Sequence, residues 1–457
     1  MLHQAIINGV RGFTGSLIVF PVAQRLEGRD MRGKQRLFAA EMARPFQARR
    51  GASWAATIET VRFAATSVPY YRTLFAKIGF DPGSLARDAK FLNDIPFLTK
   101  DIIRAEGERL LRDDHAAYRR HTAKTGGSTG PSASIFYDQE AADWSSAVTR
   151  YARTLVGAGP MRSELHFASK FPQEFPWKAR MREHVKCLSN NRYNIFFSSF
   201  EPDELEQIWR QIRSIRPYLV HGHPSTLYQL ALHVDAKHGT GRAFNVFESS
   251  GELLEKKQRD TISRVFNCRV IDRYGLAEIG VTAYQTDPQL PGLLVFDALA
   301  WPEVVPAESS ADFPGVEDAD HGELVFTGLK NRMMPLIRYR TGDLATLRET
   351  AAGFVIEEMV GRVHDIVEIA GRRLPTHYVQ DVLDRIGAVK EFQIEIRQGR
   401  PTFRIVAEPG ADRQAFRNRL ASWWGDAVDV EFIESAALNL QGWRSKFRHL
   451  VSPAADS

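Results

Sequence analysis

The feature of the sequence that most limits the possible folds is a short segment crowded with glycine and hydroxyl residues. It reads Thr-Gly-Gly-Ser-Thr-Gly, so three glycines and three hydroxyl side chains occupy six consecutive positions. Glycines let backbone N–H groups turn toward an anion without a Cβ in the way, and hydroxyl groups add further donors. The segment therefore suits a loop that wraps a phosphate group, with an exposed turn as the simpler alternative. Its residues are Thr125, Gly126, Gly127, Ser128, Thr129 and Gly130.

Two other known motifs share part of this segment. A Walker A loop ends in Gly-Lys followed by Ser or Thr, whereas Gly130 is followed by Pro131, so the phosphate-binding lysine is missing. Residues 126–130 match the Gly-x-Ser-x-Gly elbow of serine hydrolases, which needs a buried strand before the serine and a helix after it. Residues 114–121 are too charged for a buried strand, and residues 133–137 favour a strand over a helix. Both motifs are therefore disfavoured.

The size and charge of the chain set outer limits on its function. Its 457 residues are enough for two or three domains, and 44% hydrophobic with 25% charged residues is the balance of an ordinary globular protein. The net charge of +5 is small for this length, so charge gives no reason to expect a nucleic-acid partner. Cys187 and Cys268 are isolated, which excludes a CxxC zinc site and a disulfide framework. A reducing, cytoplasmic location fits this cysteine usage.

The excess of positive charge lies near the amino terminus, where residues 1–50 contain nine Lys and Arg residues against three acids. The apolar run from Phe13 to Ala23 is interrupted and far shorter than the roughly 20 residues that span a bilayer, so we expect no transmembrane segment. Arg11 is the only firm positive charge ahead of the run, which weakens a signal-peptide interpretation. We expect residues 1–50 to form a basic helical segment packed on the body, with a weak membrane-surface contact as the alternative.

The middle of the chain has the pattern of an α/β fold. Between residues 141 and 245, apolar runs alternate with helical patterns, as in a largely parallel sheet. Residues 193–197 and 217–220 are predicted strands, and residues 201–215 are the amphipathic helix between them. The string His221-Gly222-His223-Pro224 follows the second strand. Open α/β sheets bind ligands at the carboxyl ends of their strands, so this string is a candidate binding loop; two histidines alone do not make a metal site.

Further strings combine small, aromatic and charged residues. Ser250-Gly251-Glu252 ends a predicted strand, and Arg273-Tyr274-Gly275 lies shortly before Glu278. The most specific string is Arg-Tyr-Arg-Thr-Gly-Asp, which ends at Asp343, and Gly361-Arg362-Val363-His364-Asp365 follows it. Near the end of the chain, Lys446 lies between Arg444 and Arg448. Taken singly, each string has an ordinary explanation as a core tyrosine, a surface charge or a turn.

Taken together and in this order, the strings resemble the motifs of the adenylate-forming superfamily, which includes acyl-CoA synthetases, adenylation domains and luciferases. The Thr-Gly-Gly-Ser-Thr-Gly form is most similar to phenylacetate–CoA ligases and CapK-like proteins, and the resemblance spans residues 122–446. It implies a large N-terminal α/β domain with mainly parallel sheets and a small, mobile α+β C-terminal domain. We place the large domain at residues 51–361 and the small domain at residues 362–457.

The resemblance also implies a nucleotide site. In that family the loop matching residues 125–130 holds the phosphates, the ring matching Tyr274 stacks on adenine, and the carboxylate matching Asp343 accepts hydrogen bonds from both ribose hydroxyls. The glutamate matching Glu278 reaches the Mg²⁺ ion on the phosphates. The implied nucleotide-binding residues outside the loop are Ser250, Gly251, Glu252, Arg273, Tyr274, Gly275, Asp343 and Arg362.

The remaining roles concern the acid, the hinge and the chemistry. The resemblance implies that His221, Gly222, His223 and Pro224 help to form the acid pocket, that His364 and Asp365 form the hinge, and that Lys446 is the mobile catalytic lysine. Three residues depart from the family pattern. Ala277 stands for the usual threonine, His364 for the first acid of the hinge pair, and Ser445 for the glycine before the lysine.

The implied reaction is the ATP-dependent activation of a carboxylic acid to an acyl-adenylate, followed by transfer of the acyl group to a thiol. The expected cofactors are ATP, Mg²⁺ and coenzyme A, with a small carboxylic acid as substrate and an acyl carrier protein as the other thiol donor. Two alternatives stay open. One is transfer to an amine, and the other is a nucleotide-binding scaffold without turnover, which the three departures favour.

Overall fold

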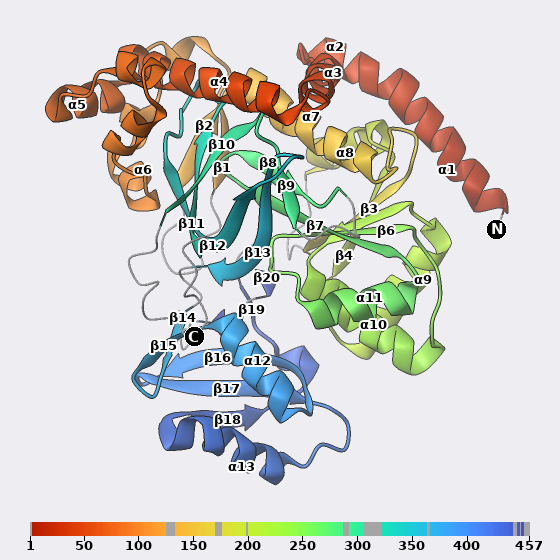
Figure 1. The fold of residues 1–457 in the computed structure, drawn as a ribbon. Helices are drawn as coiled ribbons and strands as arrows, with labels where there is room; N and C mark the ends of the chain where they lie inside the picture. The colour runs from red at the N-terminus through yellow and green to blue at the C-terminus, as the bar shows by residue number, and fades with distance from the viewer. Residues whose placement is uncertain are drawn as a thin grey trace.

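The computed structural model describes residues 2–124, 133–169, 176–197, 200–286, 292–305, 321–362, 366–441, 446–447 and 449–451. One eleven-stranded sheet, with helices packed against it, forms a large body, and a separate four-stranded sheet forms the core of a small C-terminal unit (Figure 1). This is the α/β architecture with a large and a small part that the sequence predicted. The strand order in the large sheet is β10-β11-β12-β13-β9-β8-β7-β6-β5-β3-β4.

One half of the large sheet is parallel, as expected. Its strands are β3 (Glu164–Ser169), β4 (Arg192–Phe197), β5 (Leu219–Gly222), β6 (Val246–Ser250) and β7 (Arg269–Leu276). Parallel neighbours need long crossover connections, and helices supply them. These are α8 (Trp177–Ser189), α9 (Pro202–Ile215), α10 (Pro224–His238) and α11 (Lys256–Phe266). Helix α9 buries Leu205, Ile208, Trp209 and Ile212, the spacing of one helical face.

The other half of the sheet is antiparallel, so the expectation of mainly parallel strands holds only from β3 to β7. The antiparallel strands are β8 (Gly280–Tyr284), β9 (Leu293–Val295), β10 (Ala300–Val305), β11 (His321–Gly328), β12 (Tyr339–Glu349) and β13 (Phe354–Arg362). The reason is visible between β12 and β13, where Thr350 and Gly353 exchange backbone hydrogen bonds of 2.9 and 3.2 Å. Such a tight turn is too short to return the chain in the parallel sense.

The amino-terminal part of the chain, up to residue 155, supplies mostly helices to the large body. They are α3 (Met31–Met42), α4 (Phe46–Ser67), α5 (Pro69–Ile78), α6 (Lys100–Glu106) and α7 (Gln139–Leu155), with the 3₁₀ turns η2 (Pro82–Ala86), η3 (Ala89–Asp94), η4 (Gly107–Leu110) and η5 (His115–Ala117). The boundary expected at residue 50 falls inside α4, so the backbone has no break there. The strands β1 (His121–Lys124) and β2 (Ser134–Tyr137) form a separate hairpin.

The first helical rod differs from the expectation. Helices α1 (Leu2–Thr14) and α2 (Phe20–Glu27) are joined by a π-helical segment, η1 (Gly15–Val19), into one rod. Within it, Ile6–Glu27 is a 22-residue helix that is long and apolar enough to cross a membrane by length and composition. Its most apolar 18-residue window has a mean hydropathy of 1.4, and 22% of that window is buried. The helix continues beyond both ends of the apolar run from Phe13 to Ala23. The length of that run therefore underestimated the length of the helix.

The small unit has the expected α+β construction. Its sheet has the order β18-β17-β16-β21, and α12 and α13 pack on it. The elements are β14 (Ile366–Ile369), β15 (Arg372–Pro375), α12 (Thr376–Ile386), β16 (Val389–Arg397), β17 (Arg400–Ala407), α13 (Arg413–Trp424), η7 (Gly425–Ala427), β18 (Asp429–Phe432), η8 (Ser435–Ala437), β19 (Leu440–Gln441), β20 (Lys446–Phe447) and β21 (Leu450–Val451). The division of the chain into domains stays a prediction.

Candidate functional site

The structure gathers several predicted residues at the carboxyl ends of β5 and β6. The His223 ring Nδ1 lies 2.9 Å from the carbonyl oxygen of Ser250. The Glu252 carboxylate accepts a 3.3 Å hydrogen bond from the backbone N–H of Ser225, just after Pro224 begins α10. Two loops that are about 30 residues apart in the sequence are thus tied together, because adjacent parallel strands end at the same edge of the sheet.

A second group of predicted residues meets across the antiparallel half. The Tyr274 hydroxyl donates a 2.7 Å hydrogen bond to Asp343 Oδ2, although the two residues are 69 positions apart. Asp343 is 2% exposed and lies opposite Arg362 in the register of β12 and β13. The Arg362 side chain lies outside the described part of the chain. Gly275, next to Tyr274, approaches the facing strand closely, since a Cβ there would lie 3.3 Å from the Gly280 carbonyl oxygen.

Glu278 lines a small open cavity of about 70 Å³, which Tyr137 of β2 also lines. Its carboxylate accepts a 2.5 Å hydrogen bond from the Tyr339 hydroxyl. Burial and the Glu278 charge raise the pKa of Tyr339 above its usual range, so its hydroxyl keeps the proton that it donates. A fixed carboxylate at an open cavity fits a hard cation such as Mg²⁺, which prefers oxygen ligands.

The predicted phosphate loop, Thr125, Gly126, Gly127, Ser128, Thr129 and Gly130, lies outside the described residues. Its two flanks are described, and Lys124 of β1 pairs with Ser134 of β2 in an antiparallel hairpin. The segment therefore leads from strand to strand. This agrees with the rejection of the serine-hydrolase elbow, which leads from a strand into a helix.

The hinge and lysine predictions are only partly covered. His364 and Asp365 lie outside the described residues, between the end of β13 at Arg362 and the start of β14. The Lys446 backbone pairs with Gln441 in the β19–β20 hairpin, and its side chain is likewise outside the description. Figure 1 shows β20 on the side of the small unit that faces the large sheet.

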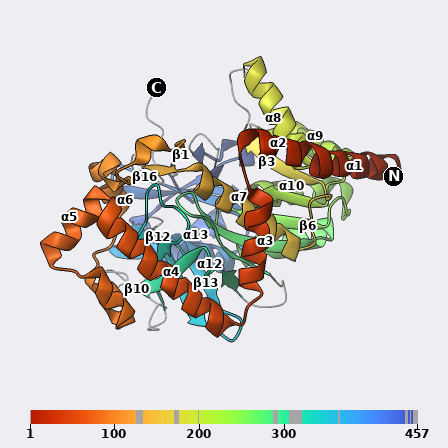
Figure 2. The same cartoon turned by 90° about the horizontal axis from the view of Figure 1, so that it is seen from above.

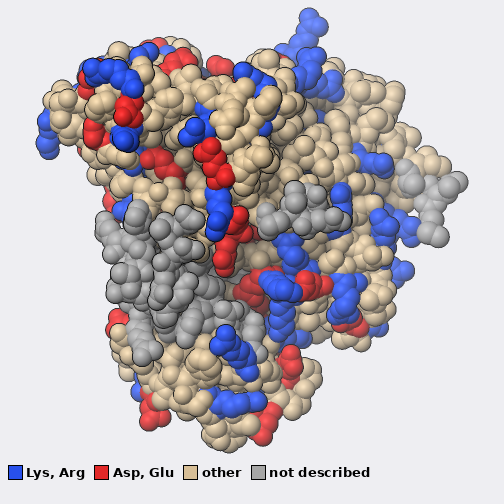
Figure 3. Space-filling model, viewed as in Figure 1, with Lys and Arg blue, Asp and Glu red and all other residues tan. Residues whose placement is uncertain are grey.

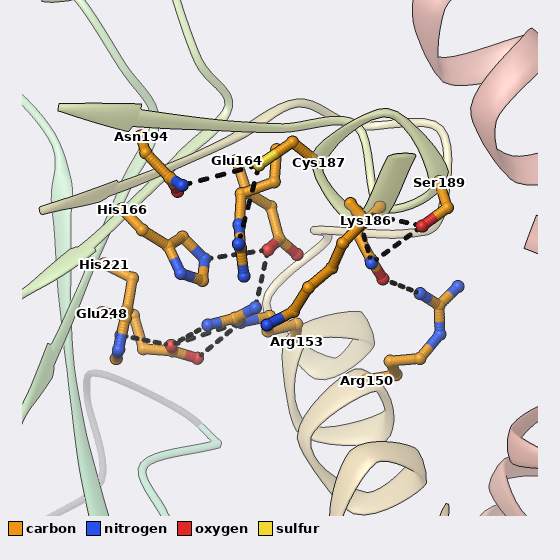
Figure 4. Close-up of polar contacts among 12 residues, drawn as sticks. Arg150, Arg153, Glu164, His166, Lys186, Cys187, Ser189, Asn194, His221 and Glu248 are labelled. Carbon is orange, nitrogen blue, oxygen red and sulfur yellow. Dashed lines mark hydrogen bonds and ion pairs between the residues drawn. The ribbon is translucent and has the colours of Figure 1, made fainter. Parts of the chain in front are cut away.

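A buried row of charged and polar groups extends from the predicted acid pocket, and sequence reasoning named only its His221. His166, His221 and Glu248 occupy matching register positions on β3, β5 and β6, so they share one face of the sheet. Figure 4 shows Arg153 of α7 reaching between two carboxylates, with distances of 2.8 Å to Glu248 and 2.6 Å to Glu164. A single acid inside the apolar strand Val246–Ser250 was the available signal, since a buried charge requires a partner.

The charges in this row determine which groups are ionised. Burial raises the pKa of Glu248, but Arg153, His221 and Arg273 lower it by more, so it stays well below its usual range. Burial, only partly offset by Glu248, lowers the pKa of His221 to about 4. Burial and Arg153 also hold the pKa of His166 well below its usual range. At neutral pH both imidazoles are therefore uncharged.

One His and Glu cluster among the described residues has metal-ligand geometry. Ligand atoms of Glu206, His233 and His238 all lie within 4.8 Å of one another on α9 and α10. The same carboxylate, however, is 3.2 Å from Lys237 and 3.1 Å from Arg210. These two cations already neutralise the carboxylate, and their positive charges disfavour binding of a metal ion. We therefore interpret the cluster as an ion-pair network between two helices.

The two parts of the protein contact each other beside the candidate site. The His449 ring Nε2 lies 2.9 Å from Glu255 at the amino end of α11, and Lys257 donates a 3.0 Å hydrogen bond to the Val389 carbonyl. Burial disfavours a charged His449, but Glu255 and Glu391 outweigh it and raise the pKa of His449 to about 9. The imidazolium is therefore present at neutral pH and holds the small unit against the large one.

Raising the pH is expected to loosen this contact. Because the pKa of His449 is raised on docking, its contribution is complete below about 6.5 and is lost as the pH rises through about 9. Small-angle scattering should show the radius of gyration increasing over that range. His449→Gln keeps a donor but no charge, so its scattering should not change there. An equal pH response in that variant would contradict the assignment.

Comparison with known proteins supports the resemblance drawn from the motifs. No protein-family model matches the chain. It is 24% identical over 407 residues to the phenylacetate–coenzyme A ligase of Escherichia coli K12, covering 83% of this chain and 89% of that enzyme. It is 25% identical over 409 residues to the phenylacetate–coenzyme A ligase of Thermus thermophilus, covering 81% of this chain and 88% of that enzyme. The prediction of a phenylacetate–CoA ligase-like, adenylate-forming relative is confirmed.

The fold has close counterparts among solved structures. The chain superposes on 2-hydroxyisobutyryl-CoA ligase in its postadenylation state with a TM-score of 0.67 and 17% identity, covering 89% of this chain and 90% of that one. The same ligase in its thioesterification state gives a TM-score of 0.56 over the same coverage. Both superpositions support the predicted fold.

Proposed function

We infer that this chain, a relative of the phenylacetate–coenzyme A ligases, is an AMP-forming acid–thiol ligase. A carboxylate oxygen of the acid attacks the α-phosphorus of ATP, the bond to the β-phosphate breaks, and pyrophosphate leaves with its electron pair. The thiol sulfur of coenzyme A then attacks the acyl carbon, AMP leaves, and the thiol proton passes to solvent. The observation that carries this proposal is the 2.7 Å bond between Tyr274 and Asp343, which joins two separate motifs at one site.

Different residues of the chain have different roles in the first step, the formation of the acyl-adenylate. Asp343 and Tyr274 hold the nucleoside, residues 125–130 hold the phosphates, and Lys446 neutralises charge at the α-phosphate. Glu278 would hold Mg²⁺, which when bound neutralises phosphate charge. No general base is required, because a carboxylic acid is already ionised at neutral pH.

The acid pocket is proposed at the ends of β5 and β6. His221, Gly222, His223 and Pro224 line the turn there, and Gly222 is held close to Phe167, since a Cβ on the glycine would lie 3.0 Å from that ring. We propose coenzyme A as the acyl acceptor, with an acyl carrier protein as the other thiol, and a cytoplasmic location.

Acid-dependent ATP–pyrophosphate exchange tests the proposal directly. Purified protein with MgATP is screened against aryl, hydroxy, amino and fatty acids, and exchange with at least one class is expected. No exchange with any class would favour a nucleotide-binding scaffold, the alternative that Ala277, His364 and Ser445 suggest. Mass spectrometry of products formed with coenzyme A, carrier protein or amine then identifies the acceptor, and an amide product would overturn the thiol assignment.

Asp343→Ala is expected to weaken ATP binding by about 1.5–3 kcal/mol, roughly 10- to 100-fold, because the ribose loses a charged hydrogen-bond acceptor. Calorimetric titration with ATP measures the effect, and circular dichroism checks the fold. Thr346→Val is the matched control, since Thr346 is also buried on β12 but bonds to His321 instead. Unchanged ATP affinity in folded Asp343→Ala would remove the residue from the site.

A further inference from the structure

The rod α1–η1–α2 exposes a continuous apolar side. Between Ile6 and Leu26, eight large apolar side chains are between 40% and 82% exposed. They are Ile6, Ile7, Val10, Phe13, Leu17, Ile18, Val22 and Leu26. Contiguous apolar surface of this extent is rare on soluble proteins and marks an interaction site.

The opposite side of the same rod is fixed to the body. Gly12 and Gly15 lie so close to the Met161 and Leu188 carbonyl oxygens that a Cβ on either glycine would collide with them. The Asn8 side chain donates a 2.8 Å hydrogen bond to the Ile215 carbonyl, and Arg11 donates one of 2.8 Å to the Arg192 carbonyl. The rod therefore has a defined outer side.

The π-helical segment keeps the exposed apolar residues before and after it on the same side of the rod. A π-helical turn contains more residues than an α-helical turn, so it rotates all later side chains backward around the axis. The residues before it, such as Val10 and Phe13, and those after it, Val22 and Leu26, consequently remain exposed together. An uninterrupted α-helix would rotate Val22 and Leu26 toward the body.

The charges around the apolar side are mostly positive. The first acidic residue of the sequence is Glu27, so the rod as far as Leu26 carries only Arg11 and Arg25 as charged side chains. Helix α8 meets the rod near Gly15 and exposes Trp177, Met181 and Val185 one helical turn apart. It also carries Lys178, Arg180, Arg182 and Lys186 against one acid, Glu183. Figure 2 shows α8 leaving the body beside α2, and Figure 3 shows basic side chains projecting at the top of the molecule.

We propose that this surface docks on a bilayer that contains anionic lipids, with the rod lying along the interface. An apolar face buried in the acyl region, flanked by Lys and Arg near the headgroups, is the arrangement of interfacial helices. The rod does not span the bilayer in this fold, because one side is bonded to the protein along its length. A symmetric contact between two copies would place the basic rods against each other, which like charges oppose.

Vesicle sedimentation of the full chain tests the proposal. We expect binding to phosphatidylcholine vesicles that contain phosphatidylglycerol, weaker binding to phosphatidylcholine alone, and a loss at high salt. Val10→Ser/Phe13→Ser/Leu17→Ser should bind at least about tenfold less, since apolar burial drives insertion. Ile78→Ser/Phe91→Ser/Trp423→Ser, which removes exposed apolar side chains elsewhere, should bind like the parent protein. Both variants should keep the parent's thermal midpoint and pyrophosphate exchange.

Several results would overturn the proposal. The first is that the protein binds neither kind of vesicle. The second is equal binding to both lipid mixtures, and the third is an equal loss of binding in the two triple variants. Resistance of the bound protein to alkaline extraction would show spanning instead of docking. A dimer in solution that only the Val10/Phe13/Leu17 variant abolishes would identify a second copy as the partner. Exchange activity is independent of all these readouts, so failure here leaves the proposed reaction standing.

Discussion

Lys446→Ala is expected to lower the rate of acyl-adenylate formation by roughly 10²–10³, the effect of losing one charged contact to a transition state. The structure places the Lys446 backbone three residues before His449, whose ring contacts Glu255 beside the Ser250–Glu252 turn. Three residues of chain reach at most about 11 Å, so the lysine starts close to the candidate site.

Two assays separate a catalytic lysine from a structural one. Single-turnover formation of the adenylate should fall in Lys446→Ala, whereas thioester formation from a supplied acyl-adenylate should be nearly unchanged, because the small unit is then turned away. Lys390→Ala is the matched control, as these are the two lysines of residues 362–457. Equal loss in both half-reactions would make Lys446 structural. Loss in neither would redirect attention to Arg444 or Arg448.

Glu248→Gln is expected to lower the free energy of unfolding of the large part by about 3–5 kcal/mol, because removing one partner of a buried ion pair leaves the other charge uncompensated. Glu248 is fully buried and accepts hydrogen bonds from Arg153 and from the Tyr284 hydroxyl, at 2.8 and 2.9 Å. Since the folded state lowers the pKa of this carboxyl, its contribution is present above about 4.5 and is lost as the pH falls further.

Urea unfolding followed by tryptophan fluorescence measures the effect. Asp113→Asn is the matched control, because its carboxylate pairs with Arg72 at 2.9 Å on the surface, where solvent screens the pair. Its unfolding midpoint should hardly move. Arg273→Gln added to Glu248→Gln should restore part of the loss, since it removes one of the unpaired charges. A midpoint for Glu248→Gln equal to that of the control would refute the account of the buried row.

The sequence predicted those parts of the site that consist of contiguous residues. A glycine- and hydroxyl-rich loop carries its chemistry in its own backbone, and the string ending at Asp343 is recognisable wherever it occurs. Periodicity likewise predicted α9, because the face that a helix buries follows from spacing alone. The order of the strings then predicted both the fold and the family resemblance.

Only the tertiary structure decided those features that depend on contacts between secondary-structure elements. The residues of Val246–Ser250 do not distinguish a parallel from an antiparallel sheet, and the length of each connection fixed the strand direction. Glu248 gains its charge balance from Arg153, 95 positions earlier, once α7 packs on the sheet. The rod α1–η1–α2 has apolar residues on several sides, and contact of Gly12 and Gly15 with the body selected which of them face solvent. Burial is a property of packed surfaces, so a single chain segment does not specify it.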